Sequence, residues 1–173
     1  MHPTSLHRRD RSEPLLTPKV RRFIAIWTAT VLCALAAVVL ADPATSRPHG
    51  WSFAGAVLWR GVFYGAIDGL LLSSFPILAT FAAFRSRRRS KRGLAAVGAT
   101  ALMVSLLFTA AYHVGYPDFR GSKLRKPIAG DVLWSAPTLL TLNPAGAPLA
   151  HVALHVAAVT HASQTGTFLP PHR

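Results

Sequence analysis

Two histidines four residues apart, His151 and His155, are the side chains of this chain best placed to do chemistry. They lie in the apolar stretch 143–162, and residues four apart share one face of an α-helix. Two imidazoles on one face can hold a single Zn²⁺ ion, and a third ligand leaves the fourth position for water. The metal acidifies that water and makes it a nucleophile. The pair therefore predicts a metal-dependent site within an apolar segment.

Other polar side chains lie in apolar segments at a matching depth. Asp68 is about seven residues, or roughly 10 Å, inside the predicted outer end of its segment, and His151 is roughly 12 Å inside its own. His113 ends a third segment, and Asp118 follows in the next loop. We expect His113, His151 and His155 to be metal ligands. Asp68 or Asp118 would act as the base or orient a ligand.

The last apolar segment separates small residues from large ones. Its small residues and its two histidines fall within roughly 80° of one another at about 100° per residue. They are Ala147, His151, His155, Ala158 and Ala162. The larger residues that point the other way are Leu149, Val152, Val156 and Thr160. Small residues favour contacts between membrane helices, so we expect the histidines to face the interior and the branched side chains to face lipid.

The composition indicates a membrane protein. Of the 173 residues, 51% are hydrophobic and 14% are charged, which excludes an ordinary soluble globule. The net charge is +13, and most of the basic residues gather in two clusters beside apolar segments. The clusters are Arg8, Arg9, Arg11, Lys19, Arg21 and Arg22, and then Arg85, Arg87, Arg88, Arg89, Lys91 and Arg92. Such clusters mark cytoplasmic ends and favour contact with anionic lipid headgroups. The basic residues are not interleaved with aromatic residues as in nucleic-acid-binding proteins, so we expect no nucleic-acid binding.

We therefore expect an all-α, polytopic membrane protein, a bundle of four transmembrane helices in the cell membrane. The predicted spans are 23–41, 61–84, 93–114 and 143–162. Residues 1–22 would be a disordered basic cytoplasmic tail and residues 163–173 a short C-terminal tail, with both termini cytoplasmic. A cleaved signal peptide is the alternative for the first span, but its apolar run exceeds the usual length of about 7–15 residues.

Two short segments and a row of glycines complete the expected organisation. Residues 51–60 would lie at the membrane interface before the second span. Residues 132–142 are too short to span and would form a re-entrant or interfacial lid over the outer face. Gly61, Gly65 and Gly69 recur every four residues, so they form a ridge that another helix can approach closely, including a helix of a homo-oligomer.

The order of these polar residues resembles that of the CREST superfamily of intramembrane hydrolases, which includes the alkaline ceramidases and adiponectin-receptor-like proteins. Its members pair a late H-x-x-x-H with an earlier Ser, His and Asp. Here Thr109-x-x-x-His113, Asp118 and His151-x-x-x-His155 follow the same order. The chain departs from the pattern in its four predicted spans rather than seven, and in Thr rather than Ser. The resemblance implies a metal-dependent hydrolase of a lipid-like substrate.

Other interpretations use the same residues. His113 with His151 or His155 would suit the axial positions of a b-type haem inside a four-helix bundle, making an electron-transfer protein. The histidines would instead be interhelical hydrogen-bonding contacts in a non-enzymatic scaffold, assembly or transport subunit. The single cysteine, Cys33, excludes an intrachain disulfide framework. The excess of Arg over Lys is compatible with a GC-rich bacterial genome.

Overall fold

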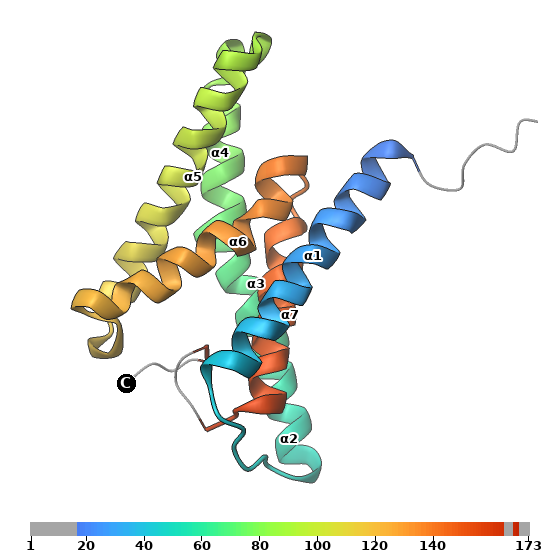
Figure 1. Cartoon of the computed structure of the whole chain (residues 1–173), viewed down its shortest axis with the longest axis vertical. Helices are drawn as coiled ribbons and strands as arrows, with labels where there is room; N and C mark the ends of the chain where they lie inside the picture. Colours follow the sequence, from blue (N-terminus) through green and yellow to red (C-terminus); the bar gives the residue numbers. More distant parts are fainter. Residues whose placement is uncertain (1–16, 165–167, 170–173) are drawn as a thin grey trace, which may run out of the picture.

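The computed structural model describes residues 17–164 and 168–169, and within these ranges every regular element is a helix (Figure 1). The main helices are α1 (Pro18–Ala41), α2 (Gly50–Ala56), α3 (Tyr64–Asp68), α4 (Phe75–Ala83), α5 (Lys91–Val114), α6 (Arg125–Thr141) and α7 (Gly146–His161). The all-α prediction is confirmed for this part of the chain.

Three of the described helices are long and apolar enough to cross a membrane. They are α1 with 24 residues, the helical run Gly50–Ala83 with 34, and α5 with 24. Large apolar side chains such as Leu32, Leu40 and Leu107 are exposed on them, as lipid-facing residues are. The fourth predicted span corresponds to α7, whose 16 residues reach only about 24 Å.

The first two spans begin earlier than the sequence predicts. Thr17 accepts a hydrogen bond from the backbone N–H of Val20, and this cap starts α1 at Pro18. Residues 18–22 are therefore helical, while the rest of the predicted tail, residues 1–16, lies outside the described residues. The predicted interfacial piece 51–60 is likewise continuous with the second span, because the helix runs unbroken from Gly50 to Ala83.

Two π-helical segments interrupt this long helix, Val57–Phe63 and Gly69–Ser74. The second lies immediately before α4, where Pro76 cannot donate a backbone hydrogen bond. Wider π-helical turns often occur at functional sites. Here the carbonyl of Arg60 accepts from a histidine of α7, and the carbonyl of Leu72 accepts from a serine of α5. Each π-helical segment thus offers a carbonyl to another helix.

The glycine ridge packs against α7 of the same chain. Gly61, Gly65 and Gly69 are buried. They lie against Val156, Val152 and Pro148, respectively, so α7 runs antiparallel to the long helix. A Cβ added at Gly69 would lie 2.5 Å from the Pro148 Cα. The predicted close helix approach is confirmed within the chain, and a homo-oligomer contact through this face would require α7 to move aside.

The same packing refines the prediction for the two sides of α7. Its small residues and histidines are buried, as expected, and Leu149 is exposed. Val152 and Val156 are only partly exposed, because they lie on the glycine ridge. The expectation that both valines face lipid is therefore wrong.

Helices α6 and α7 form a hairpin inside the bundle. Leu142 ends α6 in a left-handed conformation (φ 57°), and α7 returns along the glycine ridge. Thr138 holds the tip of the hairpin, because its hydroxyl accepts from the Ala147 N–H and donates to the Asn143 carbonyl. The segment 132–142, predicted to be re-entrant or interfacial, forms the second half of α6 and its C-cap. Trp134, Ser135, Pro137 and Thr138 are buried, whereas Val132, Leu133, Leu140 and Leu142 are exposed.

The end of α7 lies beside the loop that joins α1 to α2. The Thr45 N–H donates to the His161 carbonyl over 3.1 Å, and the His161 Nε2 lies 3.0 Å from the Asp42 carbonyl. This end of the bundle is opposite the one that carries the basic turn Arg85–Arg89 and the start of α1 (Figure 1). The last segment was predicted to end on the side of the basic turn, and this is wrong: α7 ends on the opposite side, beside the loop between α1 and α2.

Part of the predicted C-terminal tail 163–173 also packs on the bundle. Leu169 is fully buried in a core cluster with Ala34 and Val38 of α1 and Val159 of α7. Residues 165–167 and 170–173 lie outside the described ranges. The core therefore sits where α1, α6 and α7 meet, next to the site described below.

Candidate functional site

A cavity of about 70 Å³ lies among the long helix, α5, α6 and α7. Its lining comprises Asp68, Leu72, Thr109, His113, Phe119, Lys126, Pro127, Gly130, Asp131, Trp134, His151, Leu154, His155 and Phe168. Four of the predicted site residues, Asp68, His113, His151 and His155, therefore line one cavity. The fifth, Asp118, is exposed on the short helix Pro117–Phe119 and is not part of this lining.

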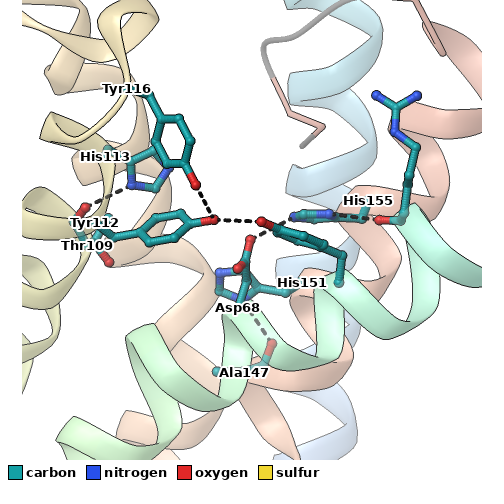
Figure 2. Close-up of polar contacts among 10 residues, drawn as sticks. Asp68, Thr109, Tyr112, His113, Tyr116, Ala147, His151 and His155 are labelled. Carbon is teal, nitrogen blue, oxygen red and sulfur yellow. Dashed lines mark hydrogen bonds and ion pairs between the residues drawn. The ribbon is translucent and has the colours of Figure 1, made fainter. Parts of the chain in front are cut away.

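Asp68 and His155 form the closest pair of predicted site residues (Figure 2). The His155 Nε2 lies 3.6 Å from the Asp68 Oδ2, and both side chains are largely buried. On the other side of the ring, Nδ1 lies 3.1 Å from the Arg60 carbonyl. A carbonyl can only accept, so Nδ1 carries a proton and the ring directs Nε2 toward the carboxylate.

The other two histidines are held in the same way, each by a carbonyl of its own helix. The His151 Nδ1 lies 3.1 Å from the Ala147 carbonyl, and the His113 Nδ1 lies 2.8 Å from the Thr109 carbonyl. All three rings thus use Nδ1–H as a donor to backbone, which leaves the lone pair of a neutral ring on Nε2. Metal-ligating histidines are oriented by this kind of contact.

The distances are partly those of a metal site. Two atoms each about 2.0–2.1 Å from a tetrahedral Zn²⁺ lie roughly 3.3 Å apart, which is close to the 3.6 Å between Asp68 and His155. Two imidazoles on one such ion have ring centroids about 5 Å apart, whereas those of His151 and His155 are 6.5 Å apart. Among residues 17–164 and 168–169, no three His, Cys, Asp or Glu side chains are close enough to hold a metal ion. The ligand roles therefore stay a prediction that requires the rings to approach.

A chain of tyrosine hydroxyls leads to this pair from the end of α5. The Tyr64 and Tyr112 hydroxyls are 3.0 Å apart, and the Tyr116 hydroxyl donates to Tyr112 over 3.4 Å. The ring of Tyr64 stacks on His155 with a centroid distance of 6.4 Å. Figure 2 shows the Tyr116 hydroxyl next to that of Tyr112, whose ring points toward Asp68 and His155. The chain places hydrogen-bonding groups next to His155, while the three tyrosines themselves are not among the residues that line the cavity.

Sequence reasoning missed a second buried carboxylate, Asp131 on α6. It is only 2% exposed and lines the cavity. Hydroxyls of Ser73, Ser105 and Ser135, from three different helical segments, lie 2.7–2.8 Å from its oxygens. Asp131 follows a basic stretch with Lys123, Arg125 and Lys126, and no site residue was predicted there. The four-residue spacing of Asp131 and Ser135, which puts both on one helix face, is the signal that could have found it.

Thr109 contributes a hydroxyl with no hydrogen-bond partner. Its side chain is 2% exposed and lines the cavity, yet Oγ1 contacts no donor or acceptor among the described residues. Most serines and threonines in membrane helices bond to a carbonyl of the preceding turn, as Thr80 and Thr100 do here. A buried hydroxyl without a partner is unfavourable and is a polar group available to a ligand.

No protein-family model, curated protein or solved structure matches this chain. The resemblance to the CREST superfamily thus stays a prediction, and the function has to be argued from the site.

Proposed function

We propose that this membrane protein binds a Zn²⁺-like ion in the cavity and hydrolyses a lipid-like substrate there. The observation that carries the proposal is the common orientation of the three histidines. His113, His151 and His155 each anchor Nδ1 on a backbone carbonyl and line one cavity, and His155 also faces Asp68. In this proposal the three imidazoles are the ligands, and Asp68 completes the set or acts as the base.

The ligand set would supply a metal-bound water acidic enough to attack a carbonyl near neutral pH. Asp68 lies beside His155, where it can accept the proton of that water and return it to the leaving group. Water would add across an ester or amide bond, giving an acid and an alcohol or an amine. The hydroxyls of Tyr64 and Tyr112 lie next to His155, beside the cavity rather than in its lining, and would hydrogen-bond to a polar end of the substrate that extends past it.

Zinc fits the residues better than haem does. A carboxylate next to an imidazole is a common zinc ligand pair, whereas the axial ligands of a b-type haem are two histidines. Asp68 lies 3.6 Å from the ring nitrogen that a haem iron would need. The haem alternative would leave this carboxylate without a role.

We further propose that the protein is a multi-pass protein of the cell membrane, with the basic turn Arg85–Arg89 at the cytoplasmic face next to anionic headgroups. The start of α1 would then be cytoplasmic, and the end of α7 would lie at the outer face with the loop 42–49. The cavity would open in the outer half of the bilayer, which suits a substrate that arrives from the lipid phase.

Hydrolysis assays in mild detergent test the proposal with fluorogenic lipid esters and amides. Wild type should cleave at least one class in the presence of Zn²⁺. Asp68→Asn and His155→Gln should lower the rate by about 10²-fold or more. The matched control is His161→Gln on the same helix, where the ring contacts the Asp42 carbonyl and not the cavity. Equal rates in His155→Gln and wild type would contradict the proposal and favour a non-enzymatic scaffold or transport subunit.

A further inference from the structure

Asp131 is the centre of a buried cluster of oxygen atoms beside the histidine site. Ser73 donates to Oδ1 over 2.7 Å, and Ser135 donates to the same atom over 2.8 Å. The Ser105 hydroxyl lies 2.8 Å from Oδ2 and 2.8 Å from the Leu72 carbonyl. The three serines and Asp131 are 0–2% exposed. The cluster thus combines one carboxylate, three hydroxyls and a carbonyl of the second π-helical segment.

The cluster holds fewer protons than its contacts require. The carboxylate and the carbonyl of Leu72 can only accept, so both contacts of Ser105 with them need its single proton. Ser105 also lies 3.2 Å from the Ser135 hydroxyl, whose own proton already goes to Asp131. One further positive charge among these oxygens would satisfy the contacts that lack a proton.

We infer that this cluster is a binding site for a small monovalent cation, Na⁺. Carboxylate, hydroxyl and carbonyl oxygens are the donors that hard cations prefer. One carboxylate with one monovalent cation is neutral, whereas a divalent cation would leave a net charge inside the membrane, where net charge is costly. The contacts of the cluster join oxygens 2.7–3.2 Å apart, which is hydrogen-bond spacing. The oxygens must therefore move apart slightly to admit a cation, and they move less for Na⁺ than for the larger K⁺.

The cavity provides the route to this site. Asp131 and Leu72 belong both to the cluster and to the cavity lining. Thr109 also lines the cavity, and its buried Oγ1 has no hydrogen-bond partner. An incoming cation that loses its water molecules would meet this hydroxyl oxygen within the cavity that Asp131 also lines. The Na⁺ site uses no residue of the proposed metal site, so either proposal can fail without the other.

Thermal unfolding of purified protein in mild detergent tests the inference, with NaCl, KCl or choline chloride at equal ionic strength. If Na⁺ binds with a dissociation constant of about 10 mM, 100 mM NaCl should raise Tm by about 3–6 °C over choline chloride. KCl should give a much smaller shift. Asp131→Asn and Ser73→Ala should abolish the Na⁺-specific shift. Ser74→Ala is the matched control, because Ser74 is equally buried but bonds to Thr138 and Pro144.

The outcomes separate a cation from a proton. If Tm is the same in NaCl and choline chloride but depends on pH through Asp131, the missing charge is a proton and the Na⁺ site is refuted. If Ser74→Ala loses the Na⁺ shift as fully as Ser73→Ala does, the shift is not specific to the cluster, which also refutes it. Direct ²²Na⁺ binding to wild type and Ser73→Ala keeps the test decisive if Asp131→Asn fails to fold. The Na⁺ shift should persist in His155→Gln.

Discussion

Replacing Gly69 by alanine tests the packing that forms the site. The added Cβ would lie 2.5 Å from the Pro148 Cα and 2.8 Å from the Ala147 carbonyl oxygen. These are backbone atoms, so the contact cannot be relieved by turning a side chain, and α7 would have to move by roughly 1 Å. Overpacking of this kind costs about 1–3 kcal/mol. In a chain of this length each kcal/mol lowers Tm by about 2–4 °C, so we expect a drop of about 2–12 °C.

Gly98→Ala on α5 is the control for this substitution. Its Cβ would meet only the Phe81 ring, at 3.9 Å, which is an ordinary van der Waals contact. Alanine is a better helix former than glycine by about 1 kcal/mol, so Gly98→Ala should leave Tm unchanged or raise it slightly. Both proteins would be compared by tryptophan fluorescence during heating in one detergent. Equal Tm values for Gly69→Ala and Gly98→Ala would refute the close packing of α7 on the ridge.

Three further predictions concern the hydroxyl chain, the hairpin and the cavity. Tyr112→Phe removes two hydrogen bonds to neighbouring tyrosines, so it should destabilise the fold by about 1–3 kcal/mol in thermal unfolding. An unchanged Tm would contradict the hydrogen bonds between the tyrosine hydroxyls. Cysteines at Ser46 and Gln164, in a Cys33→Ser background, should be joined by a short bismaleimide reagent, because the Gln164 side chain reaches the Ser46 hydroxyl; no crosslink would place the end of α7 elsewhere. Thr109→Val should leave Tm unchanged or raise it, because the Thr109 hydroxyl has no hydrogen-bond partner among the described residues. A clear drop in Tm would show that this hydroxyl does have a partner.

Much of the fold follows from patterns that the bilayer imposes. The apolar runs predict α1, the long helix and α5, because a crossing helix needs about 20 apolar residues. The spacing of Gly61, Gly65 and Gly69 predicts a close helix contact, and the helical face of α7 predicts which residues are buried. These predictions rest on local periodicity, and the structure bears them out.

The course of the α6–α7 hairpin could not be read from such patterns. Apolar length says that the segment 143–162 belongs in the membrane, but not from which side it enters. Contacts between residues far apart in sequence, such as Thr45 with His161, decide the direction. The same limit explains Asp131, because its three serine partners come from segments whose proximity only the folded bundle shows.

The site itself was predictable in part. Asp68 and the three histidines do line one cavity. The depths that predicted this were counted from the wrong helix ends, because the long helix begins at Gly50 and α7 ends on the side where it was expected to start. The loop residue Asp118 was included by order in the chain alone, and the structure leaves it outside the cavity lining. Side-chain distances, such as the 6.5 Å between the rings of His151 and His155, depend on rotamers that no sequence pattern specifies.

Metal analysis tests the central claim most directly. The protein would be purified in mild detergent through a tag without histidines, and wild type compared with the His151→Ala/His155→Ala double variant and the His161→Gln control. The proposal predicts about one zinc per chain in wild type and in the control, and almost none in the double variant. The absence of metal from wild type after incubation with Zn²⁺, or equal zinc in all three proteins, would contradict it. Iron with a haem absorption band would instead identify an electron-transfer protein.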